Sequence, residues 1–133
     1  MANALYTLGK QGILDGTIDV DTDNIKAVLV DAADYSPNTA TDNDLADITA
    51  GGRVATSANL TVSVSGGTVD ASDFSFTTVT GDQSEYIVIY QDTGVAGTSR
   101  LIAIYDTFTS GMPVTPNGGD IDVTVNASGL FSI

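Results

Sequence analysis

The chain contains no histidine and no cysteine among its 133 residues. These residues supply the commonest general base, the commonest zinc ligands and the thiolate nucleophiles of enzymes, so the enzyme classes that depend on them are excluded. Glu85 is the only glutamate, so hydrolysis by a pair of carboxylates would have to use aspartates alone. The sequence therefore predicts a protein that is not an enzyme and that holds no cofactor.

Basic residues are also scarce. Four lysines and arginines stand against seventeen acidic residues, which gives a net charge of −13 and an isoelectric point near 4.1. A surface of this charge repels the phosphate backbone of nucleic acids. The N-terminal residues lack the basic and apolar regions of an export signal, and no apolar run reaches the roughly 18 residues that a membrane span needs. We therefore expect a soluble, unexported protein with no nucleic-acid partner and no membrane partner.

The chain is rich in β-branched side chains, with 18 threonines, 13 valines and 10 isoleucines. Such side chains pack well on a pleated sheet and lose rotamer freedom in a helix. Hydrophobic residues make up 42 % of the chain and charged residues only 16 %, which excludes disorder. Because the length suffices for one hydrophobic core, the sequence predicts a single all-β domain spanning residues 1–133.

Alternation of apolar and polar residues marks most of the individual strands. Two segments, 86–90 and 101–105, are apolar at every position, which suits central strands that are covered on both faces. We expect these two to pair as a hairpin, and their long connection, 91–100, to project from the domain. The expected antiparallel strands, about eight in number and spaced as in sandwiches and barrels, lie at 17–21, 25–30, 60–65, 74–77, 86–90, 101–105, 121–126 and 130–133.

The N-terminal segment, residues 1–16, stands outside this strand pattern. Its apolar residues recur at roughly helical spacing, although each of two glycines weakens a helix by about 1 kcal/mol relative to alanine. We expect a short helix or an extended arm. Because the strands do not need its apolar side chains, they are candidates for contact with a partner, and packing on the domain itself is the alternative. The candidate contact residues are Leu5, Tyr6, Leu8, Ile13 and Leu14.

The tripeptide Asp92-Thr93-Gly94 has the sequence with which aspartic proteases place a catalytic carboxylate. Such an enzyme needs two of these aspartates sharing one proton, so a chain with one copy would have to dimerise. Gln91 stands where an apolar residue is expected before the aspartate. We interpret the tripeptide as the start of a turn between two strands.

The series Asp19, Asp21, Asp23 has the spacing that opens a calcium-binding loop. Asn24 replaces the glycine of an EF-hand, and Val30 replaces its final glutamate, so the loop is not an EF-hand. The three aspartates remain a weak candidate for calcium. The alternative is an acidic strand edge that discourages pairing with other sheets.

An ordered series of short segments extends over nearly the whole chain. In this order the segments resemble those of a widespread group of structural proteins of tailed phages. The segments are Gly12-Ile13-Leu14-Asp15-Gly16, Ile18-Asp19, Ile25-Lys26-Ala27-Val28-Leu29-Val30-Asp31, Tyr35-Ser36-Pro37, Tyr86-Ile87-Val88-Ile89-Tyr90, Asp92-Thr93-Gly94, Thr98-Ser99-Arg100-Leu101-Ile102 and Pro116-Asn117-Gly118-Gly119-Asp120-Ile121.

The resemblance implies a capsid cement protein, also called a head decoration protein, built as a β-sandwich of jelly-roll type. It implies a place on the exterior of the capsid in the virion, after synthesis in the host cytoplasm. The implied partners are the major capsid protein and further copies of the chain, as a trimer or a dimer. The alternatives are another virion β-domain of the tail, neck or fibre, and a carbohydrate-binding or adhesive sandwich on a surface.

Overall fold

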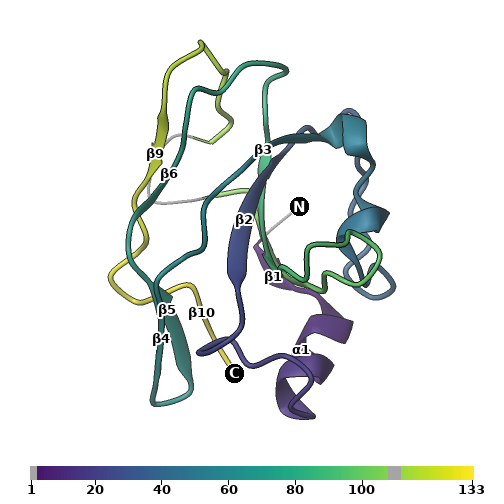
Figure 1. The fold of residues 1–133 in the computed structure, drawn as a ribbon, viewed down its shortest axis with the longest axis vertical. Helices are drawn as coiled ribbons and strands as arrows, with labels where there is room; N and C mark the ends of the chain where they lie inside the picture. The colour runs from purple at the N-terminus through teal and green to yellow at the C-terminus, as the bar shows by residue number, and fades with distance from the viewer. Residues whose placement is uncertain (1–2, 108–111) are drawn as a thin grey trace.

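Strands are the main regular structure of the chain, as its β-branched composition predicts. The computed structural model describes residues 3–107 and 112–133, of which 34 % are in strands and 11 % in helices. The prediction of a mostly β protein with antiparallel sheets is confirmed. The elements in chain order (Figure 1) are β1 (Ala4–Leu5), α1 (Thr7–Leu14), β2 (Ile25–Val30), η1 (Leu45–Asp47), η2 (Ala50–Gly52), β3 (Arg53–Thr56), β4 (Val62–Ser65), β5 (Thr68–Ala71), β6 (Phe74–Phe76), β7 (Tyr86–Gln91), β8 (Leu101–Tyr105), β9 (Ile121–Val123) and β10 (Phe131–Ser132).

The largest sheet has five antiparallel strands in the order β1-β8-β7-β2-β3. β7 and β8 pair with each other, which confirms the predicted hairpin. β2 pairs with β7 along its whole length, from Ile25 opposite Gln91 to Val30 opposite Tyr86. All five residues of β8 are buried, so the prediction that the apolar strands lie at the centre of a sheet covered on both faces is confirmed.

Alternate residues of the central strands face two different cores. Ala27 and Leu29 of β2 contribute to a main core on one face of the sheet. Val28 and Val30 of the same strand contribute to a second core on the opposite face. This alternation follows from the two-residue period of a strand, which sends successive side chains to opposite faces.

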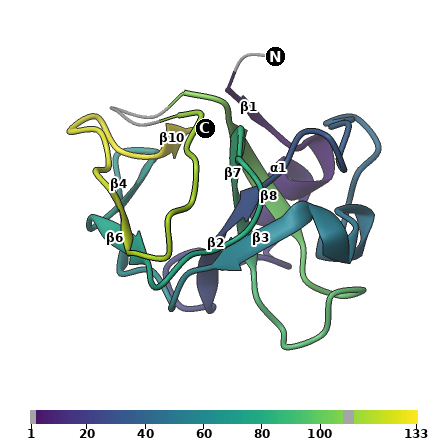
Figure 2. The ribbon, with the colours of Figure 1, turned by 90° about the horizontal axis from the view of Figure 1, so that it is seen from above.

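Two smaller sheets cover the main core. They are a three-stranded sheet in the order β10-β5-β4 and a two-stranded pair of β6 with β9. Val69 of β5, Phe76 of β6 and Val123 of β9 are buried in the main core with residues of the five-stranded sheet. Figure 2 shows these small sheets together on one side of the five-stranded sheet, away from α1.

The helix α1 lies against the edge of the five-stranded sheet and uses its two glycines to do so. A Cβ at Gly9 would overlap the carbonyl oxygen of Leu101, and a Cβ at Gly12 would lie 2.7 Å from Cδ1 of Ile18. The glycines that weaken the helical pattern in the sequence are therefore the residues that allow close packing. No helix of the described residues is long and apolar enough to cross a membrane.

The segment 17–21 was expected to be a strand, and this prediction is wrong. The structure has turns there, with the backbone N–H of Asp23 donating to the carbonyl oxygen of Asp19 over 2.7 Å. The N–H of Asp19 in turn donates to the carboxylate of Asp23 over 2.9 Å. Aspartate side chains compete with strand ladders for backbone N–H groups, and here they close a turn. The two apolar residues of the segment, Ile18 and Val20, are nevertheless buried in the main core.

Candidate contact face

The structure divides the five candidate contact residues of the N-terminal segment between the interior and the surface. Tyr6 has no exposed area, so it cannot contact a partner and is corrected to a core residue. Leu5 and Ile13 are partly buried against the main core, and Leu8 is also partly buried. Leu14, the last residue of α1, is 73 % exposed. Packing on the protein itself therefore accounts for most of the segment, and Leu14 is the side chain left for a partner.

Tyr6 fixes the start of the helix through a buried hydrogen-bonded chain. Its hydroxyl lies 2.8 Å from the hydroxyl of Tyr35, which donates to the carboxylate of Asp42 over 2.7 Å. Burial raises the pKa of Tyr6 and of Tyr35 well above the ordinary value, and for Tyr35 the hydrogen bonds to Asp42 and Tyr6 raise it further. Both phenols therefore stay neutral, and they join the N-terminal segment to the loop that follows β2.

The outer side of the helix forms a shallow recess of about 470 Å³, which we call the α1 face. Near its end, the hydroxyl and backbone N–H of Thr17 donate to the carboxylate of Asp15. Thr17 also lines a second recess, formed with the base of the connection between β7 and β8. The residues of the α1 face are Thr7, Lys10, Gln11, Leu14 and Asp15.

Two of the four basic residues line these two recesses. Lys10 lies on the α1 face itself. Arg100, in the second recess, donates to the side chain of Asn43 over 3.0 Å and lies 3.8 Å from a carboxylate oxygen of Asp44. The pKa of Asp15 is lowered, chiefly by the hydrogen bonds from Thr17 and to a smaller degree by Arg100. The strong negative charge of the chain is therefore partly compensated here.

The tripeptide that begins at Asp92 has the geometry of a turn. The carboxylate of Asp92 accepts from the N–H of Gly94 over 3.0 Å, and Gly94 has a positive φ of 86°. The same carboxylate lies 3.0 Å from the ammonium of Lys26. These contacts, with the Gly94 N–H first, lower the pKa of Asp92. The aspartate is held ionised beside a cation, whereas a protease dyad requires two carboxylates that share a proton.

The weak calcium candidate is not supported by the geometry. The carboxylates of Asp19 and Asp23 accept backbone N–H groups within their own turn, and Asp23 also accepts from the side chain of Gln91 over 2.6 Å. The oxygens of Asp19, Asp21 and Asp23 do not converge within the 4.8 Å that a shared cation would allow, as judged over the described parts of the chain.

A different set of carboxylates does converge. Single oxygens of Asp31, Asp34 and Asp82 lie within 4.8 Å of one another. Hard cations such as Ca²⁺ prefer such oxygen ligands. Asp31 is buried, but its carboxylate already accepts from the N–H of Ala33 over 2.9 Å, and the adjacent Glu85 accepts from the N–H of Ala32. Asp31 and Glu85 thus hold the start of the loop after β2, and the cluster could not be found from the sequence because Asp82 comes from a distant segment.

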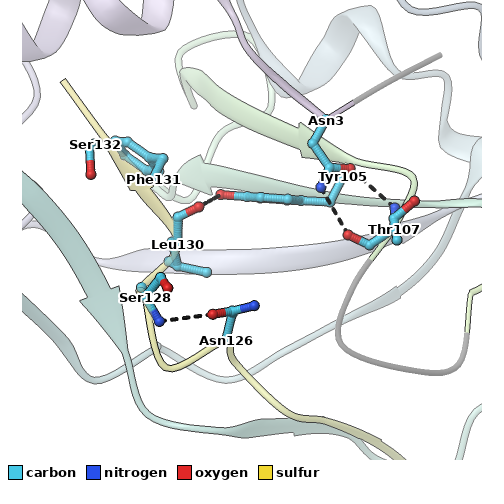
Figure 3. Close-up of a pocket in the computed structure, with 9 residues that line it drawn as sticks. Asn3, Tyr105, Thr107, Asn126, Ser128, Leu130, Phe131 and Ser132 are labelled. Carbon is cyan, nitrogen blue, oxygen red and sulfur yellow. Dashed lines mark hydrogen bonds between the residues drawn. The ribbon is translucent and has the colours of Figure 1, made fainter.

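Another recess, of about 500 Å³, lies between the end of β8 and the C-terminal segment (Figure 3). The hydroxyl of Tyr105 donates to the carbonyl oxygen of Leu130 over 2.8 Å, and Asn3 exchanges hydrogen bonds with the backbone of Thr107. Sugar-binding sites favour exposed aromatic rings as stacking platforms. Tyr105 is only 8 % exposed, so its ring does not offer one.

Comparison with known proteins identifies no family for the chain. No protein-family model matches the chain, and no curated protein matches it. Functional inference therefore rests on the residues and geometry of the chain itself.

Proposed function

We propose that the chain is a non-enzymatic virion structural protein, a cement or decoration protein that binds the outside of an assembled tailed-phage head and stabilises the shell. The ordered segments that resemble phage structural proteins support the virion context. The α1 face supports a docking role, and the observation that carries this part is Leu14, which is 73 % exposed on a helix that is otherwise fixed to the sheet.

A rigid element is a suitable support for such a contact. Gly9 and Gly12 bring α1 close to β8 and to Ile18, and the hydroxyl of Tyr6 holds the preceding residues. Docking therefore requires little additional ordering of the chain, which keeps the entropic cost of binding low. Burial of one leucine side chain is worth about 1.5 to 3 kcal/mol, so one such contact per copy is weak and many copies are needed.

The proposed mechanism is mass action on the assembled shell. A protein that binds only the assembled lattice stabilises that state without any chemical step, because binding lowers the free energy of the assembled form alone. A copy that touches two shell subunits gains from the effective concentration of its second contact. Histidine and cysteine are not needed for this role, in agreement with their absence.

The proposed partner is the major capsid protein. Lys10 on the α1 face and the pair of Arg100 with Asp44 beside it reduce the local excess of negative charge. An apolar patch of the shell can approach there against less electrostatic repulsion than elsewhere on a chain of charge −13. Attachment through this face should therefore persist or strengthen at high salt, whereas attachment through exposed aspartates should be lost.

We further propose that the two layers form a sandwich of jelly-roll type within a single domain. The arrangement of the main core between the five-stranded sheet and the two smaller sheets supports a two-layer architecture. All strand pairs within residues 3–107 and 112–133 are antiparallel, as a jelly roll requires.

The test uses phage heads that lack the protein. Purified protein added to such heads should bind in many copies and raise the temperature at which the heads release DNA. Leu14→Asp should weaken binding by about tenfold, the loss expected for about 1.4 kcal/mol of apolar contact, and Leu14→Met should bind normally. Ile133→Asp, which adds the same charge at a residue that is 52 % exposed elsewhere, is the matched control and should also bind normally.

Three results would count against the proposal. Heads that gain no heat resistance would contradict stabilisation. Equal binding of the Leu14→Asp and Ile133→Asp variants would contradict docking through the α1 face. A labelled protein found only on tails would replace the head with another place in the virion.

A further inference from the structure

The outer edge of β4 has no strand beside it. β4 is the last strand of the three-stranded sheet β10-β5-β4, and no strand of the described residues pairs with its free side. In Figure 1 the β4–β5 hairpin extends to the lower margin of the molecule, on the opposite side from α1. We propose that this edge pairs with the same edge of a second copy of the chain, in antiparallel orientation.

The backbone groups of β4 that face outward belong to Val62 and Val64. The N–H of Ser72 donates to the carbonyl oxygen of Thr61, so Thr61 directs its backbone groups toward β5. Alternate residues of an antiparallel strand repeat this direction, so Ser63 and Ser65 also face β5. The N–H and C=O groups of the two valines therefore point away from the sheet, where an incoming strand would find two donors and two acceptors.

This edge lacks the features with which proteins block sheet-to-sheet pairing, namely charges, prolines and bulges. Between Arg53 and Asp70 the sequence has no charged residue and no proline. The pairing of β4 with β5 runs without a register shift. The other edge strand of four residues, β3, carries Arg53 and has a register shift against β2. The contrast singles out β4 in a chain whose net charge is −13.

A second copy is the occupant that the sequence of this edge fits. The run Thr61-Val62-Ser63-Val64-Ser65 is nearly symmetric about its central serine. A two-fold axis at Ser63 places Ser63 opposite its counterpart and each Val62 opposite a Val64, with all outward backbone groups of the valines paired. The result is a continuous six-stranded sheet across the two copies, with valines facing valines on one side.

Charge also favours this occupant. Asp70 is the only charged side chain within the strands of the three-stranded sheet. Two copies of charge −13 repel each other over most of their surfaces, but strand β4 carries no charged side chain and lets them approach with less opposition. Val64 is 47 % exposed and would be covered in the pair.

The contact between two four-residue strands is small compared with the roughly 1,200 Å² that stable complexes bury at least. The pair should therefore be weak in dilute solution and populated at high concentration, as between copies crowded on one surface. The inference does not depend on the proposed function, because pairing of free copies can be measured without any shell.

The absence of cysteine allows a direct test. In the proposed register the two Ser63 residues form a pair without mutual hydrogen bonds, whose Cα atoms lie about 4.5 Å apart, within the range of a disulfide. The Ser65 residues lie about 13 Å apart, four residues out of register. Ser63→Cys should therefore form a disulfide-linked dimer under mild oxidation at least about tenfold faster than Ser65→Cys, which is on the same strand and face and is also exposed. Equal rates for the two variants would overturn the proposal.

A second pair of variants tests the edge without a cysteine. Val64→Lys adds a charge to the free edge at an exposed position, and Ile133→Lys adds the same charge at a similarly exposed position outside it. Sedimentation is measured over a hundredfold range of concentration, from about 10 μM to 1 mM. The unaltered chain and Ile133→Lys should form dimers at the high end of this range, whereas Val64→Lys should remain monomeric. A monomeric unaltered chain, or dimers that survive Val64→Lys, would overturn the proposal.

Discussion

The five-stranded and three-stranded sheets of this protein differ in how completely the rest of the chain covers them. The central strands of the five-stranded sheet are buried on both faces, and all residues of β8 are buried. In the three-stranded sheet, β4 has one partly buried residue and three exposed ones. The first sheet holds the fold together, whereas the second leaves backbone and side chains available to other molecules. The comparison teaches that the burial that stabilises this chain is concentrated in the strands of the five-stranded sheet, whereas β4 contributes little of it.

The sharpest test of this comparison is a matched pair of truncations. Ile104→Ala in β8 removes a side chain with no exposed area and leaves a cavity, so the free energy of unfolding should fall by about 2 to 5 kcal/mol. Val64→Ala in β4 removes a side chain that is 47 % exposed and should cost no more than about 0.5 kcal/mol. Urea unfolding followed by circular dichroism measures both. Similar costs at the two sites would break the distinction between the sheets.

The attachment of α1 to the five-stranded sheet gives the next largest effect. Gly9→Ala should gain roughly 1 kcal/mol of helix propensity but lose about 1 to 3 kcal/mol, because its Cβ would overlap the backbone of Leu101 and lie 2.9 Å from Cα of Ile102. The clash should win, with a net loss of stability in urea unfolding. Gly97→Ala is the control, since no atom lies within 4 Å of its added Cβ, and its stability should be unchanged. A more stable Gly9→Ala variant would show that the helix packs loosely.

The tyrosine chain tests the second core of the same sheet. Tyr35→Phe removes the hydroxyl that bonds to the hydroxyl of Tyr6 and to the carboxylate of Asp42. The free energy of unfolding should therefore fall by about 1 to 2 kcal/mol at neutral pH. The pKa of Tyr35 is raised above its ordinary value near 10 by burial. The folded form therefore keeps its proton while the unfolded form loses it, and stability should fall as the pH rises above about 10.

Unfolding measured as a function of pH, in the variant and in the unaltered chain, supplies the control. Tyr35→Phe should show a shallower loss of stability above pH 10 than the unaltered chain, because one of the raised tyrosines is gone. Equal slopes for the two proteins would mean that Tyr35 is as accessible to ionisation in the folded state as in the unfolded state.

The smallest effect is expected at the surface connection between β7 and β8. Asp92→Asn removes the ion pair with Lys26 and should lower the free energy of unfolding by about 0.5 to 1 kcal/mol. The loss is small because both side chains are partly exposed. The pKa of Asp92 is lowered, so its stabilising contribution is present above the ordinary value near 3.8 and is lost as the pH falls through that region. Lys26→Gln should cost a similar amount, and the double variant no more than either single one. Additive costs in this cycle would show that the ion pair contributes nothing.

The difference between the sheets also explains which parts of the fold the sequence could predict. The bounds of β2 and β8 agree with the expected 25–30 and 101–105, because strands buried on both faces have long apolar runs that are easy to recognise. β5 was missed although Gly66 and Gly67, both with positive φ, mark the hairpin turn before it. Its alternation of Thr68, Val69, Asp70 and Ala71 is short, and one charged residue obscures it.

Features that depend on distant residues could not be predicted. The meeting of Asp31 and Asp34 with Asp82, and of Tyr6 with Tyr35, requires knowledge of how the loop after β2 folds back over the sheet. The strand prediction for residues 17–21 failed for a local reason. Aspartate side chains can close a turn in a segment whose apolar residues still alternate. The exposure of Leu14 and the free edge of β4 likewise became visible only in three dimensions.

The most direct test of the proposed role is an electron cryomicroscopy map of the virion. The account predicts density of this fold in many copies on the outer surface of the head, with α1 and Leu14 against the shell. Heads whose outer surface carries no such density, with the fold found on the tail or nowhere in the particle, would contradict it.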